Sequence, residues 1–135
     1  MTSETDIADA ERVSRFIYDS DKIFADGRPK ANAFFPMFEA SLQRLETSLC
    51  HLLCEDARVW LLGRQARPHQ ALKGRADFGV AVATTEKLRC LSSPMDNFSE
   101  HAVLIEWPPE KAAQKAIGVA IAKGCGPVTL LPPDH

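Results

Sequence analysis

The chain has 135 residues, of which 45% are hydrophobic and 25% charged, and its formal net charge is -2. This length suits one domain with its own core, and the composition is that of a globular protein. No apolar run approaches the roughly 20 residues of a membrane-spanning helix, and the slight acidity argues against tight binding to nucleic acid. Residues 1–8 are polar, so we expect them to be disordered. The N-terminus has no apolar core, so we expect no secretory signal and a cytoplasmic protein.

The first third of the chain carries weak local signals. Residues 11–18 have apolar side chains at positions 13, 16 and 17, which fits either a helical turn or a short strand. Asp26-Gly27 is the strongest turn signal in the segment that follows. The apolar stretch 31–37 lies among prolines, which suits an edge strand or a packed loop.

The region 42–53 fits both a helix and a strand. Its leucines recur at helical spacing, but the residues from 45 to 49 also alternate as they would in a strand. We favour a strand over residues 44–51, followed by a helix over residues 55–66. Acidic residues in the first turn of that helix and arginines near its end suit the helix dipole: Glu55, Asp56, Arg64 and Arg67.

The second half predicts two interior strands, Ala76–Ala83 and Ala102–Trp107, because their residues are apolar or small on both faces. Residues 88–91 are expected to form a short partner strand, and Val128–Leu131 a last short strand. A proline start, an alanine-rich side and a glycine stop predict a helix over residues 109–123.

This order of elements predicts an α+β fold: a single domain over residues 1–135, with a mixed or antiparallel sheet covered by one or two helices. We expect the helix over residues 109–123 to cover one face of the two interior strands. The other face needs cover from the helix over residues 55–66 or from a second subunit, so a homodimer is one of two expectations.

Three polar residues interrupt these apolar strands and form the candidate polar site. Arg75 and Asp77 are two positions apart, so their side chains lie on the same face of one strand. His101 begins a strand that we expect to be the neighbour. Such a cluster suits an anionic or amide-bearing ligand, whereas a structural ion pair at the margin of the sheet is the simpler interpretation.

The four cysteines, Cys50, Cys54, Cys90 and Cys125, favour reduced, buried thiols. Cys50 and Cys54 flank a histidine, but a closed zinc site needs a second ligand pair, so we expect neither metal nor cofactor. A thiol nucleophile could be assembled from Cys50 or Cys90 with His101 and Asp77. The leucines around both cysteines argue for burial instead.

The segment from Gly63 to Arg75 contains no acidic residue. Its candidate anion contacts are Arg64, Arg67 and Lys73, although a solvated connector explains the same charges. Four aromatic residues could line an apolar pocket between sheet and helix, although plain core is the commoner role. They are Phe34, Phe35, Trp60 and Trp107.

Two segments carry a family resemblance: Arg75-Ala-Asp-Phe-Gly-Val and His101-Ala-x-Leu-Ile-x-Trp-Pro-x-x-Lys-x-x-Gln114. With them the chain, from Val13 onward, resembles a family of small uncharacterised bacterial proteins encoded in mobile or variable genomic regions, such as gene cassettes and phages. The resemblance implies an accessory protein and transfers no catalytic residue, because the family has no assigned activity.

Two functions fit these observations. The one we favour is a non-enzymatic protein that binds a protein partner or a small ligand, because no complete catalytic set is present. The alternative is a small enzyme acting on a nucleotide or RNA-like substrate, with its site around Arg15, Arg75, Asp77 and His101.

Overall fold

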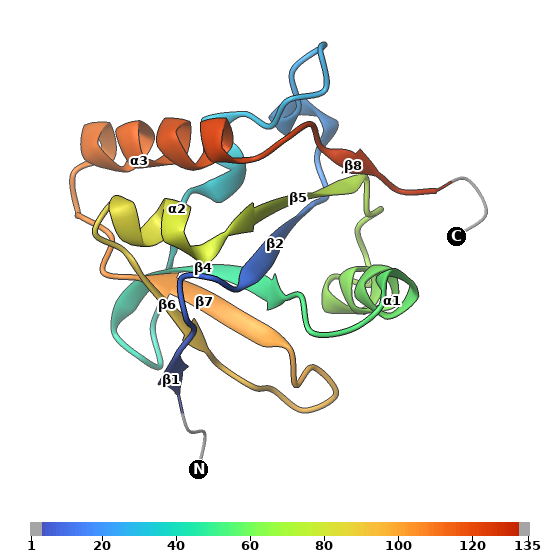
Figure 1. The fold of residues 1–135 in the computed structure, drawn as a ribbon, viewed down its shortest axis with the longest axis horizontal. Helices are drawn as coiled ribbons and strands as arrows, with labels where there is room; N and C mark the ends of the chain where they lie inside the picture. The colour runs from blue at the N-terminus through green and yellow to red at the C-terminus, as the bar shows by residue number, and fades with distance from the viewer. Residues whose placement is uncertain (1–3, 133–135) are drawn as a thin grey trace.

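The computed structural model describes residues 4–132, and within them the chain forms an eight-stranded antiparallel sheet with helices on both faces (Figure 1). The order of the strands is β1-β6-β7-β4-β2-β5-β8, and β3 pairs with β4 outside that path. The strands are β1 (Thr5–Asp6), β2 (Arg12–Ile17), β3 (Met37–Glu39), β4 (Arg44–His51), β5 (Gly74–Gly79), β6 (Arg89–Ser92), β7 (His101–Ile105) and β8 (Thr129–Leu130). The helices are α1 (Asp56–Ala66), α2 (Val80–Thr85) and α3 (Lys111–Gly124), with 3-10 turns η1 (Ser20–Lys22) and η2 (Ala31–Phe34).

Alternation along the strands divides the apolar residues into two layers. Val13 and Ile17 of β2 belong to the larger core, which α3 and η2 cover, while Phe16 belongs to the core under α1. In Figure 1, α3 and α1 lie on opposite sides of the sheet. On its face of the sheet, α1 packs over Phe16 of β2, Cys50 of β4 and Arg75 of β5, and a hollow lies beside its last turn.

The α+β prediction is confirmed, as are the strand over residues 44–51 and the helix over residues 55–66. The ambiguous segment 11–18 contains a strand, β2, and residues 31–37 divide between η2 and the start of β3. The predictions that both strands are interior and that the helix over residues 109–123 covers one of their faces are also confirmed. β5 lies between β2 and β8, β7 lies between β6 and β4, and α3 packs on the face that both strands share.

The predicted strand Ala76–Ala83 is wrong at both ends. It starts at Gly74 and stops at Gly79, after which the chain turns directly into α2. The reason is the length of its neighbour. The register of β2 ends with Arg12 opposite Gly79, and the residues before Arg12 form a turn in which the Glu11 N–H donates to the Ala8 carbonyl. The next two N–H groups, those of Val80 and Ala81, donate to the carbonyls of Glu11 and Asp9 in that turn, and α2 buries the side chains of Val80 and Ala83.

The N-terminal segment also differs from its prediction. Thr5–Asp6 pairs with β6, and the side chain of Ile7 is buried in the larger core. Apolar contact and strand pairing therefore order residues that the polar sequence assigned to a disordered end, whereas residues 1–3 lie outside the described residues. No helix within residues 4–132 is long and apolar enough to span a bilayer.

Candidate functional site

The candidate site is a groove that forms where β2 parts from β4. The two strands pair only at Val13 with His51 and at Ser14 with Cys50. Further along β4, the short strand β3 takes the place of β2, with Met37 opposite Glu46. The residues of β4 between these two stretches lack a strand partner on that side, which leaves an opening between β2 and β3.

Arg15 of β2 fills the opening. Its Nη1 donates a hydrogen bond to the carbonyl oxygen of Ser48 at 2.9 Å, and its Nε donates to that of Ala33 at 2.9 Å. The guanidinium therefore replaces part of the missing strand and joins β2, β4 and η2. Burial, with a smaller contribution from the nearby Arg67, lowers the pKa of Arg15 to about 10. It forms no ion pair with a carboxylate among the described residues.

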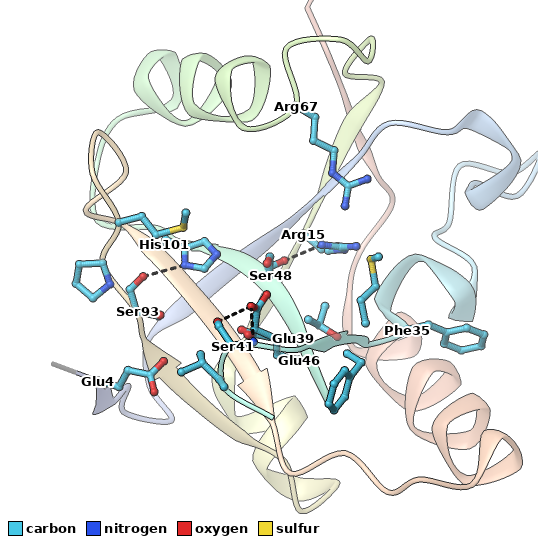
Figure 2. A pocket seen from close by; sticks show the side chains of 16 residues that line it. Glu4, Arg15, Phe35, Glu39, Ser41, Glu46, Ser48, Arg67, Ser93 and His101 are labelled. Atoms are coloured by element: carbon cyan, nitrogen blue, oxygen red, sulfur yellow. Dashed lines mark hydrogen bonds between the residues drawn. The ribbon is translucent and has the colours of Figure 1, made fainter. Parts of the chain in front are cut away.

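Arg67 brings a second cation to the same space. It follows the last residue of α1, and its guanidinium carbon lies 5.3 Å from the centre of the Tyr18 ring. Figure 2 shows Arg67 and Arg15 directed into one hollow. Like charges repel, which is why Arg67 contributes to the lowered pKa of Arg15. Arg67 also lacks a carboxylate partner within residues 4–132.

His101 lies on the other side of the hollow (Figure 2). Its Nδ1 is 2.8 Å from the carbonyl oxygen of Ser93, and since a carbonyl only accepts, Nδ1 carries the proton. Burial lowers the pKa of His101, so the imidazole is neutral at neutral pH and Nε2 keeps its lone pair. The edge-to-face contact with Phe98 holds the ring at a centroid distance of 5.2 Å. The histidine therefore offers a fixed hydrogen-bond acceptor.

Carboxylates gather at the far end of the groove. Arg44 donates to both oxygens of Glu4, at 2.9 and 2.6 Å, and lies 3.8 Å from Glu46. Hydrogen bonds from Arg44 lower the pKa of Glu4, whereas burial raises that of Glu46. Glu39 accepts a hydrogen bond from the hydroxyl of Ser41 at 2.6 Å. The groove is thus cationic at one end and acidic at the other.

The hollow has a volume of about 570 Å³, and a smaller one of about 200 Å³ adjoins it. Both are lined by Arg15, Ser48, Arg67, Met95 and His101. Apolar side chains that are 50% to 67% exposed form the walls of the larger hollow: Met37, Phe38, Leu42 and Met95. This space has the size and the mixed lining of a small-molecule site.

The predicted polar site divides into two. Arg75 and Asp77 do form an ion pair, at 3.2 Å, which confirms the expected partner of Asp77. Arg75 also contacts Asp56 of α1 at 2.9 Å, and its guanidinium lies 5.2 Å from the Trp60 ring, so Arg75 is buried under α1, whereas the side chain of Asp77 is 22% exposed. This is the structural ion pair of the simpler interpretation.

His101 does not join that pair, and the prediction of a neighbouring strand is wrong. The register places His101 opposite Cys50, Cys50 opposite Ser14, and Ser14 opposite Asp77. Two strands therefore separate His101 from Asp77, about 14 Å at the usual spacing of strands in a sheet. The order of strands, which the sequence does not state, moves the histidine to the arginine groove.

Of the candidate anion contacts in the basic segment, only Arg67 lines the groove, whereas Arg64 and Lys73 line none of the hollows described. Three of the four aromatic residues belong to the core, which was the favoured role, rather than to an apolar pocket between sheet and helix. Phe34 and Trp107 are core residues, Trp60 packs in the α1 layer, and Phe35 alone of the four lines a hollow. In the sequence, Arg15 could have been identified as a site residue because it is a charged residue within an otherwise apolar strand.

Burial raises the pKa of the Cys50, Cys90 and Cys125 thiols to about 12, so these groups stay protonated. Cys50 lies next to His101 across the strands, but a protonated, buried thiol is a poor nucleophile. Within the described part of the chain, no three His, Cys, Asp or Glu side chains gather as a metal site would require.

Comparison of the chain with models of protein families, with curated proteins and with solved structures gave no match. The function is therefore inferred from the geometry of the groove.

Proposed function

We propose that the protein is a non-enzymatic binding protein that holds a small organic anion in the groove between β4, β7 and the end of α1. The observation that carries the proposal is the pair Arg15 and Arg67, two guanidiniums in one hollow without a carboxylate partner within residues 4–132. Placing unneutralised cations together in a partly buried site is unfavourable, and an anionic ligand relieves that cost.

The remaining lining describes the ligand further. His101 Nε2 accepts a hydrogen bond, so the ligand carries a donor near its anionic group. Glu39 and Glu46 at the far end disfavour a second anion there and favour an amine or a hydroxyl. Exposed apolar side chains of the β3–β4 hairpin suit a ring or a short chain between the two ends. A carboxylate or monophosphate on a small, partly apolar body meets the requirements of the histidine, the acidic end and the apolar walls.

Thermal unfolding with a panel of probes tests this function. The probes are phosphate, benzoate, para-aminobenzoate and adenosine monophosphate. A ligand at about 100 times its Kd stabilises the native state by about 2.7 kcal/mol, which raises Tm by several degrees in a chain of this size. We expect a carboxylate or phosphate of the panel to raise Tm, and para-aminobenzoate to act more strongly than benzoate.

The matched variants are Arg67→Gln and Arg12→Gln, which remove the same charge inside and outside the groove. Both side chains are exposed, so neither change should unfold the chain. The shift in Tm should be lost in Arg67→Gln and kept in Arg12→Gln. If both variants lose the ligand-induced shift in Tm equally, or if no probe shifts Tm, the proposed site is ruled out.

A small enzyme acting on a nucleotide or RNA-like substrate is the second candidate, and one observation favours it. A neutral His101 with a free Nε2 beside two guanidiniums is an arrangement that a general base can use on a phosphate-bearing substrate. Its original site at Arg75 and Asp77 no longer supports it, because Arg75 is paired with Asp77 and lies under α1. Release of phosphate or nucleoside from adenosine monophosphate, abolished in His101→Gln, would favour this function.

The biological setting belongs to the same proposal. Free cysteines are consistent with a cytoplasmic protein, and the resemblance to proteins of mobile genomic regions supports a bacterial accessory role. A homodimer stays a prediction, with less reason for it at β5, because α1 lies over Arg75 on the other face of that strand. The molecular mass in solution would decide it.

A further inference from the structure

A second groove lies between the outer side of α3 and the segment 24–35, and it plays no part in the proposed function. It has a volume of about 670 Å³. Lys115, Val119, Ala122 and Lys123 line it from α3, at spacings that place them on one side of the helix. Figure 1 shows the segment that carries η2 next to α3. We call this hollow the α3 groove.

The floor of the α3 groove is apolar and preformed. Phe24 is 48% exposed and Val119 is 38% exposed, with Ala31 and Phe35 beside them. Gly118 allows η2 to lie directly on α3, since a Cβ at that position would be 2.7 Å from the carbonyl oxygen of Ala31. The two walls are therefore in close contact at the base of the groove and need no rearrangement to form it.

The rim of the groove is cationic. Arg28, Lys30, Lys115 and Lys123 line it, and none of its lining residues is acidic. Arg28 is paired with Asp26 at 2.9 Å. The three lysines have no carboxylate partner among the described residues, although the chain as a whole carries a net charge of -2. Local positive charge above an exposed apolar floor is complementary to a molecule that is apolar and anionic at once.

We propose that the α3 groove binds a free, amphipathic organic anion, with an aliphatic chain or ring on the floor and a carboxylate or sulfonate at the lysine rim. The volume falls in the usual range of small-molecule sites, about 300 to 1,000 Å³. Phe24, Val119 and Ala122 contact the apolar body, and Lys115 and Lys123 neutralise the head group. The two ligands share an anionic group but differ at the opposite end: the acidic far end of the first groove favours an amine or a hydroxyl, whereas the α3 groove has no acidic lining residue and suits a wholly apolar body.

Calorimetric titration with three probes of equal chain length tests the proposal: dodecanoate, dodecanol and dodecyltrimethylammonium. The two ionic probes are kept below their micelle-forming concentrations, and dodecanol below its solubility limit. We expect dodecanoate to bind most tightly and the cationic probe least. Shortening dodecanoate to decanoate should weaken binding roughly tenfold if the two lost methylenes are buried. Displacement of anilinonaphthalene sulfonate, whose fluorescence rises in apolar sites, gives a second readout.

Two double variants separate the rim from general charge effects. Lys115→Gln with Lys123→Gln should weaken dodecanoate roughly five- to tenfold and leave dodecanol unchanged. Lys73→Gln with Lys111→Gln removes the same charge outside the groove and should leave the affinities for dodecanoate and dodecanol unchanged. Val119→Asp, at an exposed position, should abolish dodecanoate binding.

Three outcomes would overturn the inference. They are equal binding of the cationic probe, equal weakening in the two double variants, and binding that starts only when micelles form, which would indicate attraction to a lipid surface. Arg67→Gln should leave dodecanoate binding intact, and loss of binding in that variant would place the probe in the first groove instead.

Discussion

Glu100 and Arg58 connect the loop before β7 to the first turns of α1, and that loop carries Met95 into the groove. Arg58 donates to both carboxylate oxygens of Glu100, at 2.7 and 3.2 Å, and these bonds hold the pKa of Glu100 at about 2. The Glu100 side chain is only 9% exposed. We predict that Glu100→Gln, which keeps the shape and removes the charge, lowers the free energy of unfolding at neutral pH.

The size of the loss follows from the pKa of Glu100. The fall from 4.5 to about 2 corresponds to an upper bound of about 3 kcal/mol, since one pKa unit is about 1.4 kcal/mol. Arg58 is 42% exposed, so water screens the pair, and we expect a loss of about 1–2 kcal/mol at neutral pH. Because the folded pKa is lowered, this stability is present above pH 4.5 and is lost as the pH falls toward about 2.

Urea unfolding at neutral pH and near pH 3 measures the effect. The difference between wild type and Glu100→Gln should fall by at least half at the lower pH. Arg89→Gln is the matched control, because it breaks the exposed pair with Asp6, and its urea midpoint should stay close to that of the wild type. A loss that is the same at both pH values would refute the electrostatic explanation.

Three further predictions concern other buried groups. Asp77→Ala should lower the free energy of unfolding by about 1–3 kcal/mol, because it removes one partner of the buried Arg75, and an unchanged urea midpoint would contradict this. Burial lowers the pKa of His101, so its protonation opposes folding: stability should decrease as the pH falls below about 6.5, and Tm of His101→Gln should vary less over that range. Cys50 and Cys90, with pKa values raised to about 12, should resist iodoacetamide in the native state and react only after unfolding, as mass spectrometry would show.

Local pattern was enough for much of the fold. The helix over residues 109–123 follows from side-chain periodicity and from the proline and glycine at its ends, which act within a few residues. The strand over residues 44–51 was only the favoured of two alternatives, because its leucines also recur at helical spacing. The pairing of Arg75 with Asp77 was likewise predictable, since residues two apart on a strand lie on one face and an unpaired buried charge is costly.

The site depended on information that no local pattern holds. Arg15, Arg67 and His101 come from β2, the end of α1 and β7, and they meet because β4 lies between β2 and β7 and parts from β2. The same strand order separated His101 from Asp77. The end of β5 at Gly79 was decided by the length of β2 rather than by the residues that follow. Periodicity reports which face a side chain occupies, whereas the neighbours on that face are set by hydrogen bonds between strands distant in sequence, and these bonds form only in the folded chain.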